Sequence, residues 1–245
     1  MKSLLISSVP KSFSTPLYRI LQNALELQPT PASRHGEVLS LLENGMEVLY
    51  GEGDARAIAD HFLQWNQGYL LKDVLAPGVM KYLAKDFNIL GLQRPAADVV
   101  YLRLYRQPFK WELMLLPPSL ASGWQPTQFK TLDSRDANVV KSYLPYLVDG
   151  ILWAQAQVRA SASALVHYDK IVSKPESLWE ALRALGYKPG EYQYITREFR
   201  RVRDDRLRVR RTREYKQIQQ IVERRRLAVE TAWRHTEGKE VIDGR

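Results

Sequence analysis

The stretch LLISSVPKSFSTPLYRIL, residues Leu4–Leu21, predicts a strand, a tight turn and the start of a helix. Residues 3–9 carry no charge and are mostly apolar, which favours a buried strand. Apolar residues then recur at helical spacing between Leu17 and Leu25. Pro16 suits the first turn of that helix, where its missing N–H costs no hydrogen bond. Hydroxyl groups gather at the helix start, on Ser12, Ser14 and Thr15.

A turn of this kind can bind an anion. The N-terminus of a helix directs unpaired N–H groups and a partial positive charge at one point, which suits a phosphate or a sulfate group. Lys11 adds a full positive charge beside it. The turn lacks the Gly-x-x-x-x-Gly-Lys-Ser/Thr pattern of nucleoside triphosphate sites, so ATP and GTP are poor ligands for it. The alternative interpretation is an ordinary capped helix beside a chance lysine.

Strand and helix patterns alternate along most of the remaining chain. We expect further strands at three apolar stretches, 68–74, 88–94 and 163–169. We expect helices from about Val38 and at 54–65, 77–87, 95–107, 137–158 and 174–187. Residues 108–136 contain four prolines and no steady period, which predicts an irregular lid or a substrate-facing region. The alternation predicts an α/β domain with a parallel sheet.

Length and composition limit the function classes. The 245 residues are 45% hydrophobic and 26% charged, which suits one α/β domain with a helical appendage. No stretch approaches the ~18 to 20 uncharged apolar residues of a membrane span. The absence of cysteine excludes disulfides, thiolate metal sites and cysteine nucleophiles. We therefore expect a cytoplasmic protein whose chemistry rests on oxygen and nitrogen groups.

The net charge of +9 comes almost entirely from one segment near the C-terminus. Thirteen Lys or Arg and five Asp or Glu lie between Arg197 and Arg226. We expect this segment to be extended at first and helical from about Thr212. Most of its charges are expected on a solvated face.

Four stretches, in order, resemble the sulfotransferase family that uses 3′-phosphoadenosine 5′-phosphosulfate. PKSFSTPL is similar to the family's Pro-Lys-Ser-Gly-Thr-Thr turn, and YLLKDV to its next strand, which carries a lysine. NILGLQRPAADVV is similar to the strand that ends in a phosphate-binding arginine. ALVHYDKIVSKPESLWEALRALGY is similar to the late strand and helix. The resemblance spans residues 1–190 and leaves 191–245 as an Arg-rich, largely helical extension.

The resemblance implies a three-layer α/β domain with a central parallel sheet flanked by helices, similar to the P-loop nucleotide hydrolases. It implies a sulfuryl transfer by in-line displacement, with 3′-phosphoadenosine 5′-phosphosulfate as donor and no metal. Lys11 would neutralise the charge that builds on the leaving phosphate oxygen, and Lys72 would reach the sulfuryl group from the neighbouring strand end. Arg94 would bind the 3′-phosphate. The 5′-phosphosulfate would lie on the turn itself, residues Lys11, Ser12, Phe13, Ser14, Thr15 and Pro16.

The chain departs from the family pattern at three places. Phe13 replaces the glycine of the turn, and Leu102 stands where the family commonly has a serine eight residues after the arginine. The Arg-Lys-Gly phosphate loop of the family is not recognisable. We expect Arg197, Arg200 and Arg201 to replace it, since the two-pronged guanidinium suits a phosphate. The alternative is that these arginines belong to a solvated basic face.

The general base has three candidates. Many family members use a histidine two positions after the strand lysine, but Val74 stands there. Another branch uses a glutamate about 22 to 28 residues after the turn lysine, and Glu37 is similar to it. His35 is the alternative base and Asp73 the third. Glu37 could instead be a first-turn residue that stabilises a helix.

Two further histidines, His61 and His167, lie in no metal-binding pattern, so we interpret both as structural. We expect a sulfotransferase that acts on a hydroxyl or amine acceptor, either a small molecule or a glycan. The rival hypothesis is a non-catalytic α/β scaffold whose Arg-rich tail binds nucleic acid or an acidic partner.

Overall fold

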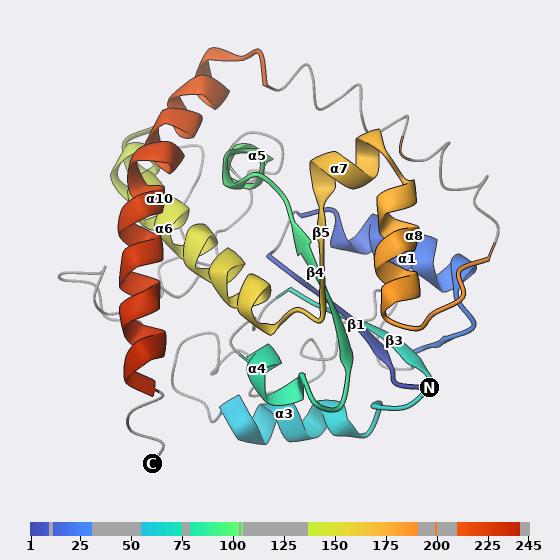
Figure 1. Ribbon diagram of the computed structural model, residues 1–245. Coiled ribbons are helices and arrows are strands. Elements are labelled where there is room, and N and C mark those ends of the chain that lie inside the picture. The colour runs from blue at the N-terminus through green and yellow to red at the C-terminus, as the bar shows by residue number, and fades with distance from the viewer. Residues whose placement is uncertain are drawn as a thin grey trace.

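The computed structural model describes residues 1–9, 12–30, 55–74, 79–102, 104, 137–190, 199 and 210–240. Within these residues the strands form one parallel sheet of five, in the order β2-β3-β1-β4-β5. Their bounds are β1 Leu4–Ser8, β2 Gln28–Pro29, β3 Tyr69–Asp73, β4 Asn88–Gln93 and β5 Ala164–His167. The predicted parallel sheet is confirmed, with β1 at its centre (Figure 1).

Helices cover both faces of the sheet, which gives three layers (Figure 1). One face carries α1 (Ser14–Ala24), α7 (Tyr168–Ser173) and α8 (Glu176–Ala184). The other face carries α3 Ala55–Leu63, α4 Met80–Leu83, α5 Ala96–Tyr101, α6 Ala137–Ser161 and α10 Arg213–Glu240. The predicted three-layer α/β architecture is therefore confirmed at this level.

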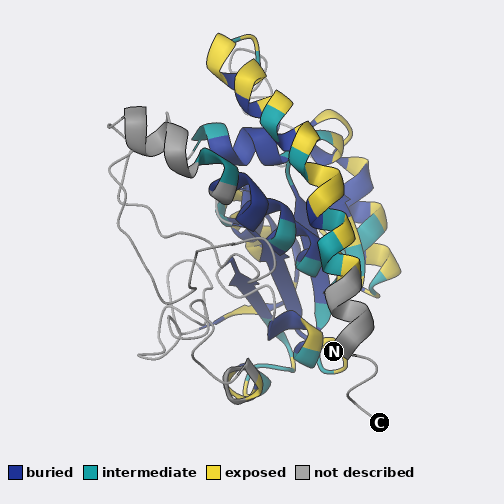
Figure 2. Ribbon diagram, turned by 90° about the vertical axis from the view of Figure 1, so that its left-hand side faces the viewer, coloured by how far each residue is buried: buried dark blue, intermediate teal, exposed yellow. Residues whose placement is uncertain are grey.

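The central strand is buried because helices cover both faces of the sheet. All residues of β1 are buried, as expected for a central parallel strand with a helix on each face. Leu4 and Ile6 face α1 and α8, whereas Leu5 faces α3 and α4. Figure 2 shows the buried strands inside the molecule and exposed residues along the outer side of α10.

Most predicted elements occur within a few residues of their expected bounds. The expected strand 163–169 is shorter, because its pairing with β4 ends at Gln93 and His167, and Tyr168 begins a helix. Asp169 lies in the first turn of that helix, where a carboxylate stabilises the helix dipole. The helix expected from Val38 and the irregular region 108–136 lie outside the described residues.

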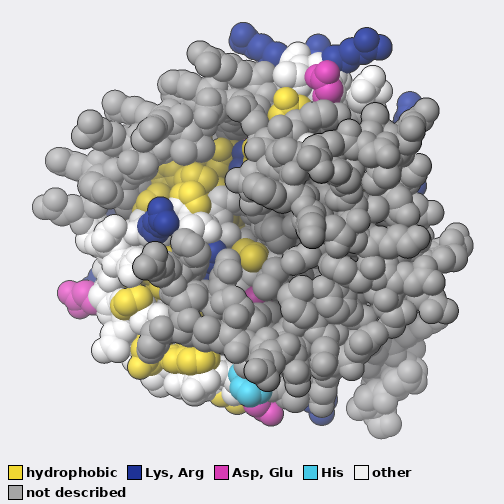
Figure 3. Space-filling view, turned by 180° about the vertical axis from the view of Figure 1, so that it is seen from behind, with side chains coloured by type: hydrophobic (Ala, Val, Ile, Leu, Met, Phe, Trp, Pro, Cys, Tyr) yellow, Lys and Arg dark blue, Asp and Glu magenta, His cyan; other side chains and the backbone are white. Residues whose placement is uncertain are grey.

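The C-terminal helix packs on the core through one apolar face, while most of the described Lys and Arg side chains of this segment are exposed, as the sequence predicted. Four residues of α10 are buried in a cluster with α5 and α6: Tyr215, Ile218, Val222 and Val229. Arg225 forms an ion pair with Asp149, whose side chain is fully buried in α6. The remaining basic residues near the start of α10 are exposed, and Figure 3 shows Lys and Arg side chains gathered at the top of the molecule.

Candidate functional site

The candidate site lies at the edge of the sheet where the strands end. Because all the strands are parallel, β1, β3, β4 and β5 present their carboxyl ends along one edge. The helices that follow β1 and β4 lie on opposite faces of the sheet. Neighbouring strands with this arrangement form the crevice in which open α/β sheets bind ligands.

The turn between β1 and α1 has a backbone conformation that is typical of glycine, although the residue there is Phe13. Phe13, the residue before α1, has φ 79° and ψ 13°. This left-handed conformation costs a non-glycine residue about 1 to 2 kcal/mol. The Phe13 ring is buried against Tyr168 and Phe199, with ring centroids 5.4 and 5.8 Å away. Phe13 thus holds a backbone conformation that glycine adopts more readily, and core packing offsets the strain.

The start of α1 leaves its donors available. No side chain caps the helix, and its first turn contains no acidic residue. The Ser12 hydroxyl is fully buried and has no hydrogen-bond partner among the described residues. A buried hydroxyl of this kind costs free energy unless a ligand or water pairs with it. The N-terminus of α1 therefore has the chemistry of an anion site.

Lys72 lies where the sequence predicts a second positive charge. It is 1% exposed, near the end of β3, and its Nζ donates a hydrogen bond of 2.8 Å to the Thr15 hydroxyl. Thr15 belongs to the first turn of α1. Two segments 57 residues apart thus place an ammonium group at the N-terminus of the helix. Asp73, the third base candidate, is buried beside it at 1% exposure.

Arg94 follows β4 and takes part in a buried ionic cluster. Its Nε lies 3.4 Å from Asp98 Oδ2, and its guanidinium carbon lies 4.1 Å from the centre of the Tyr168 ring. The Arg94 side chain is 11% exposed and the Asp98 side chain 2%. A phosphate at Arg94 would meet this carboxylate as well, so the 3′-phosphate interpretation requires further cations nearby.

Arg210 supplies one such cation, and the sequence prediction did not single it out. It donates two hydrogen bonds to Asp98, of 3.0 and 2.7 Å, and one of 2.9 Å to Asp169. Tyr215 also donates to Asp98, at 2.7 Å. Burial favours the neutral Tyr215 and, together with the negative charge of Asp98, raises its pKa. Burial lowers the pKa of Arg210, but Asp98 and Asp169 more than reverse this and raise it overall.

Several predicted site residues lie outside the described part of the chain. These are the turn lysine Lys11, the base candidates His35 and Glu37, and the tail arginines Arg197, Arg200 and Arg201. The structure brings together Ser12, Phe13, Ser14, Thr15, Pro16 and Lys72 around the start of α1. The i,i+4 spacing of Arg94 and Asp98 is the sequence signal that could have revealed their ion pair.

Metal ligation and membrane insertion are two further possibilities for the described residues. These residues contain no group of three or more His, Cys, Asp and Glu side chains that could hold a metal ion. No helix among them is both long and apolar enough to cross a membrane. Comparison of the whole chain with known protein families and with curated proteins gives no match.

Proposed function

We propose that this chain is a sulfotransferase that uses 3′-phosphoadenosine 5′-phosphosulfate and acts on a hydroxyl or amine acceptor. The observation that carries the proposal is the hydrogen bond from buried Lys72 to Thr15 at the uncapped start of α1. It supports an anion site at the point where the sequence resembles the 5′-phosphosulfate turn. The glycine-like backbone of Phe13 supports the same comparison.

The residues of the turn fit a phosphosulfate in their donor chemistry. Ser12 and Ser14 offer hydroxyl groups, and the first N–H groups of α1 offer a partial positive charge. Pro16, in the first turn, has no N–H and therefore leaves none unpaired. The nucleotide, when bound, supplies the sulfuryl group. Lys72 would bring a full charge to that group, and Lys11 would bring one to the leaving phosphate oxygen.

The proposal also assigns a site for the 3′-phosphate and a general base. Arg94, whose orientation is held by Tyr168 and Asp98, would bind the 3′-phosphate with help from Arg210 or the tail arginines. Glu37, His35 or Asp73 would take the proton of the acceptor. The sheet order with β1 at the centre supports a P-loop-like arrangement, since it places the turn beside the crevice between β1 and β4.

The test is a thermal-shift titration with 3′-phosphoadenosine 5′-phosphate against AMP. We expect the first to stabilise the fold far more, since only it has the 3′-phosphate. A ligand at about 100 times its dissociation constant adds about 2.7 kcal/mol to the stability. Equal shifts for the two nucleotides would remove the proposal. A strong shift with nucleic acid alone, lost at high salt, would support the rival scaffold function.

Lys72→Met tests the hydrogen bond from Lys72 to Thr15, because methionine keeps the buried apolar stem and removes the ammonium group. We expect 3′-phosphoadenosine 5′-phosphosulfate to bind this variant about 10 to 100 times more weakly, as loss of a charged hydrogen bond implies. Lys216→Met is the matched control, because Lys216 is exposed on α10. Equal affinity in the two variants would show that Lys72 only packs the core.

A further inference from the structure

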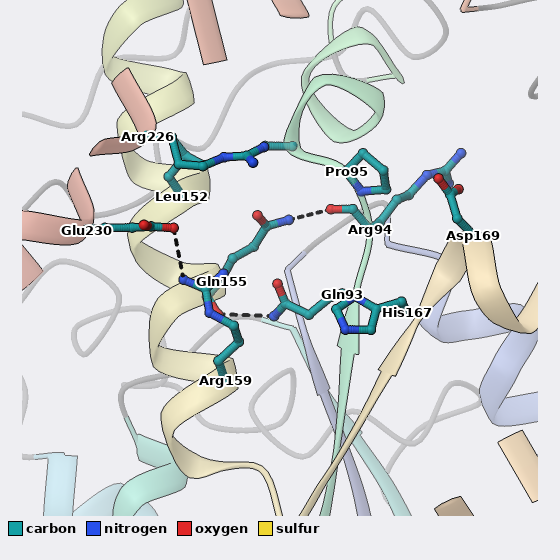
Figure 4. A pocket seen from close by; sticks show the side chains of 11 residues that line it. Gln93, Arg94, Pro95, Leu152, Gln155, Arg159, His167, Asp169, Arg226 and Glu230 are labelled. Carbon is teal, nitrogen blue, oxygen red and sulfur yellow. Dashed lines mark hydrogen bonds and ion pairs between the residues drawn. The ribbon is translucent and has the colours of Figure 1, made fainter. Parts of the chain in front are cut away.

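A cavity of about 290 Å³ lies between the ends of β4 and β5 and the helices α6 and α10 (Figure 4). It is on the face of the sheet opposite to α1. Its volume is near the lower end of small-molecule sites. Of the residues that line it, the proposed function uses only Arg94.

Two buried glutamines in the cavity wall have orientations that their partners fix. Gln93 Nε2 donates to the backbone oxygen of Gln155 at 3.0 Å, and Gln155 Nε2 donates to the backbone oxygen of Arg94 at 2.6 Å. A backbone carbonyl can only accept, so each amide must turn its nitrogen toward it. The side-chain oxygens are therefore directed away from these carbonyls, as Figure 4 shows.

Gln93 is 7% and Gln155 5% exposed, and the hydrogen bonds to the two backbone carbonyls use their amide nitrogens and leave the side-chain oxygens to accept. Both residues line the cavity. An occupant that donates hydrogen bonds would suit these two acceptors.

The charges around the cavity narrow the class of ligand. Glu230 lies 3.8 Å from Arg159, a distance too long for a hydrogen bond, so its carboxylate can accept from a ligand. Arg226 lines the cavity and its side chain is exposed. Pro95, Ala96 and Leu152 add an apolar part to the lining.

We propose that this cavity binds a small amino-acid-like zwitterion with an aliphatic side chain. The ammonium group lies against the oxygens of Gln93, Gln155 and Glu230, because an ammonium group donates three hydrogen bonds and accepts none. The carboxylate lies against Arg226, whose planar guanidinium suits it. The aliphatic part contacts Leu152. This inference does not rest on the sulfotransferase proposal.

The test uses L-leucine as the probe, in saturation-transfer NMR and calorimetry on the full chain. Isopentylamine lacks the carboxylate, and N-acetyl-L-leucine lacks the ammonium group. We expect each to bind at least about tenfold more weakly than leucine, since each loses hydrogen bonds to charged groups. Failure of leucine to bind at millimolar concentration, or equal binding of all three compounds, would overturn the proposal.

Two pairs of variants locate the binding. Arg226→Gln should weaken leucine binding by about tenfold or more, and Arg224→Gln should not, because Arg224 is exposed on α10 and does not line the cavity. Gln155→Met should abolish leucine binding. Gln219→Met is its control and should preserve binding, because Gln219 is exposed. The exposed position of Arg226 makes its variant informative even if Gln155→Met does not fold. Unchanged affinity in Arg226→Gln would place the ligand elsewhere and overturn the inference.

Discussion

Tyr187 shows how one side chain links distant parts of the fold. Its hydroxyl donates to the backbone oxygen of Lys2 at 2.9 Å and accepts from Asn88 Nδ2 at 3.0 Å. Burial disfavours the phenolate and raises the pKa of Tyr187 to about 12, although the Asn88 hydrogen bond lowers it somewhat. The neutral hydroxyl thus connects the segment after α8 to the start of β1 and to β4.

This pKa predicts a pH dependence of stability. The folded pKa lies above the ordinary value of 10.0, so the contribution of Tyr187 is fully present below about pH 10 and is lost as pH rises toward 12. By about pH 11 the loss is roughly 1 kcal/mol. Tyr187→Phe cannot ionise, so urea unfolding should show the two proteins converging in stability between about pH 8 and 11. A constant difference across that range would contradict the assignment.

For single residues, the sequence predicted where a side chain lies better than which residues it contacts. The family resemblance implied that Lys72 and the turn that contains Thr15 lie at one site, and the two side chains form a hydrogen bond. The partners of Arg94 could not be predicted fully. Arg210 lies 112 residues from Asp98, and only the packing of α10 brings them together.

At the scale of elements, the close approach of β4 to the end of α6 depends on Gly91. A Cβ atom at this position would lie 2.7 Å from Ala162 Cβ and 2.9 Å from Leu165 Cδ1. Real Cβ atoms essentially never show contacts under 3.0 Å, so the helix or the strand would have to move. The glycine therefore sets the distance between the sheet and the helix that carries Gln155.

Gly91→Ala should consequently lower the free energy of unfolding by about 1 to 3 kcal/mol, as overpacking does. Gly190→Ala is the control, since its nearest neighbour, the Ala24 oxygen, lies at an ordinary 3.5 Å. Chemical denaturation of both variants gives the measurement. If they are equally stable, the packing of β4 on α6 is looser than the distances indicate.

The elements themselves followed from local patterns, because apolar spacing and turn residues act over a few positions. Gly186, at φ 86°, ends α8 as its place in the sequence predicted, and α6 runs through Pro145. The end of β5 could not be predicted from a local sequence pattern. Its length is set by how far β4 extends beside it, and no local pattern in residues 163–169 carries that information.

For the molecule as a whole, α10 completes the layer that α5 and α6 begin. Its buried residues cover an apolar surface, and Arg210 and Arg225 pair with the buried carboxylates of Asp98 and Asp149. The charge count of the sequence suggested a solvated segment, because a count cannot show which arginines meet an aspartate far away in the chain.

Truncation after Gly190 should therefore destabilise the α/β domain severely. Removing one partner of a buried ion pair costs about 3 to 5 kcal/mol, and loss of the apolar cover of α5 and α6 adds to this. Truncation after Arg234 is the control, because it keeps Arg210, Arg225 and the buried face of α10. Circular dichroism during urea unfolding compares the two. A shorter protein that unfolds cooperatively at the same midpoint would show that α10 is dispensable.

The left-handed Phe13 has a consequence for the motion of the turn. A glycine there would sample many backbone states and would lose that freedom each time a ligand bound. Phe13 has its ring fixed between Tyr168 and Phe199, so the restriction is imposed once, during folding. An anion bound at the start of α1, as proposed above, would meet donors already in place. The backbone strain of Phe13 would then be accompanied by a smaller loss of entropy on binding.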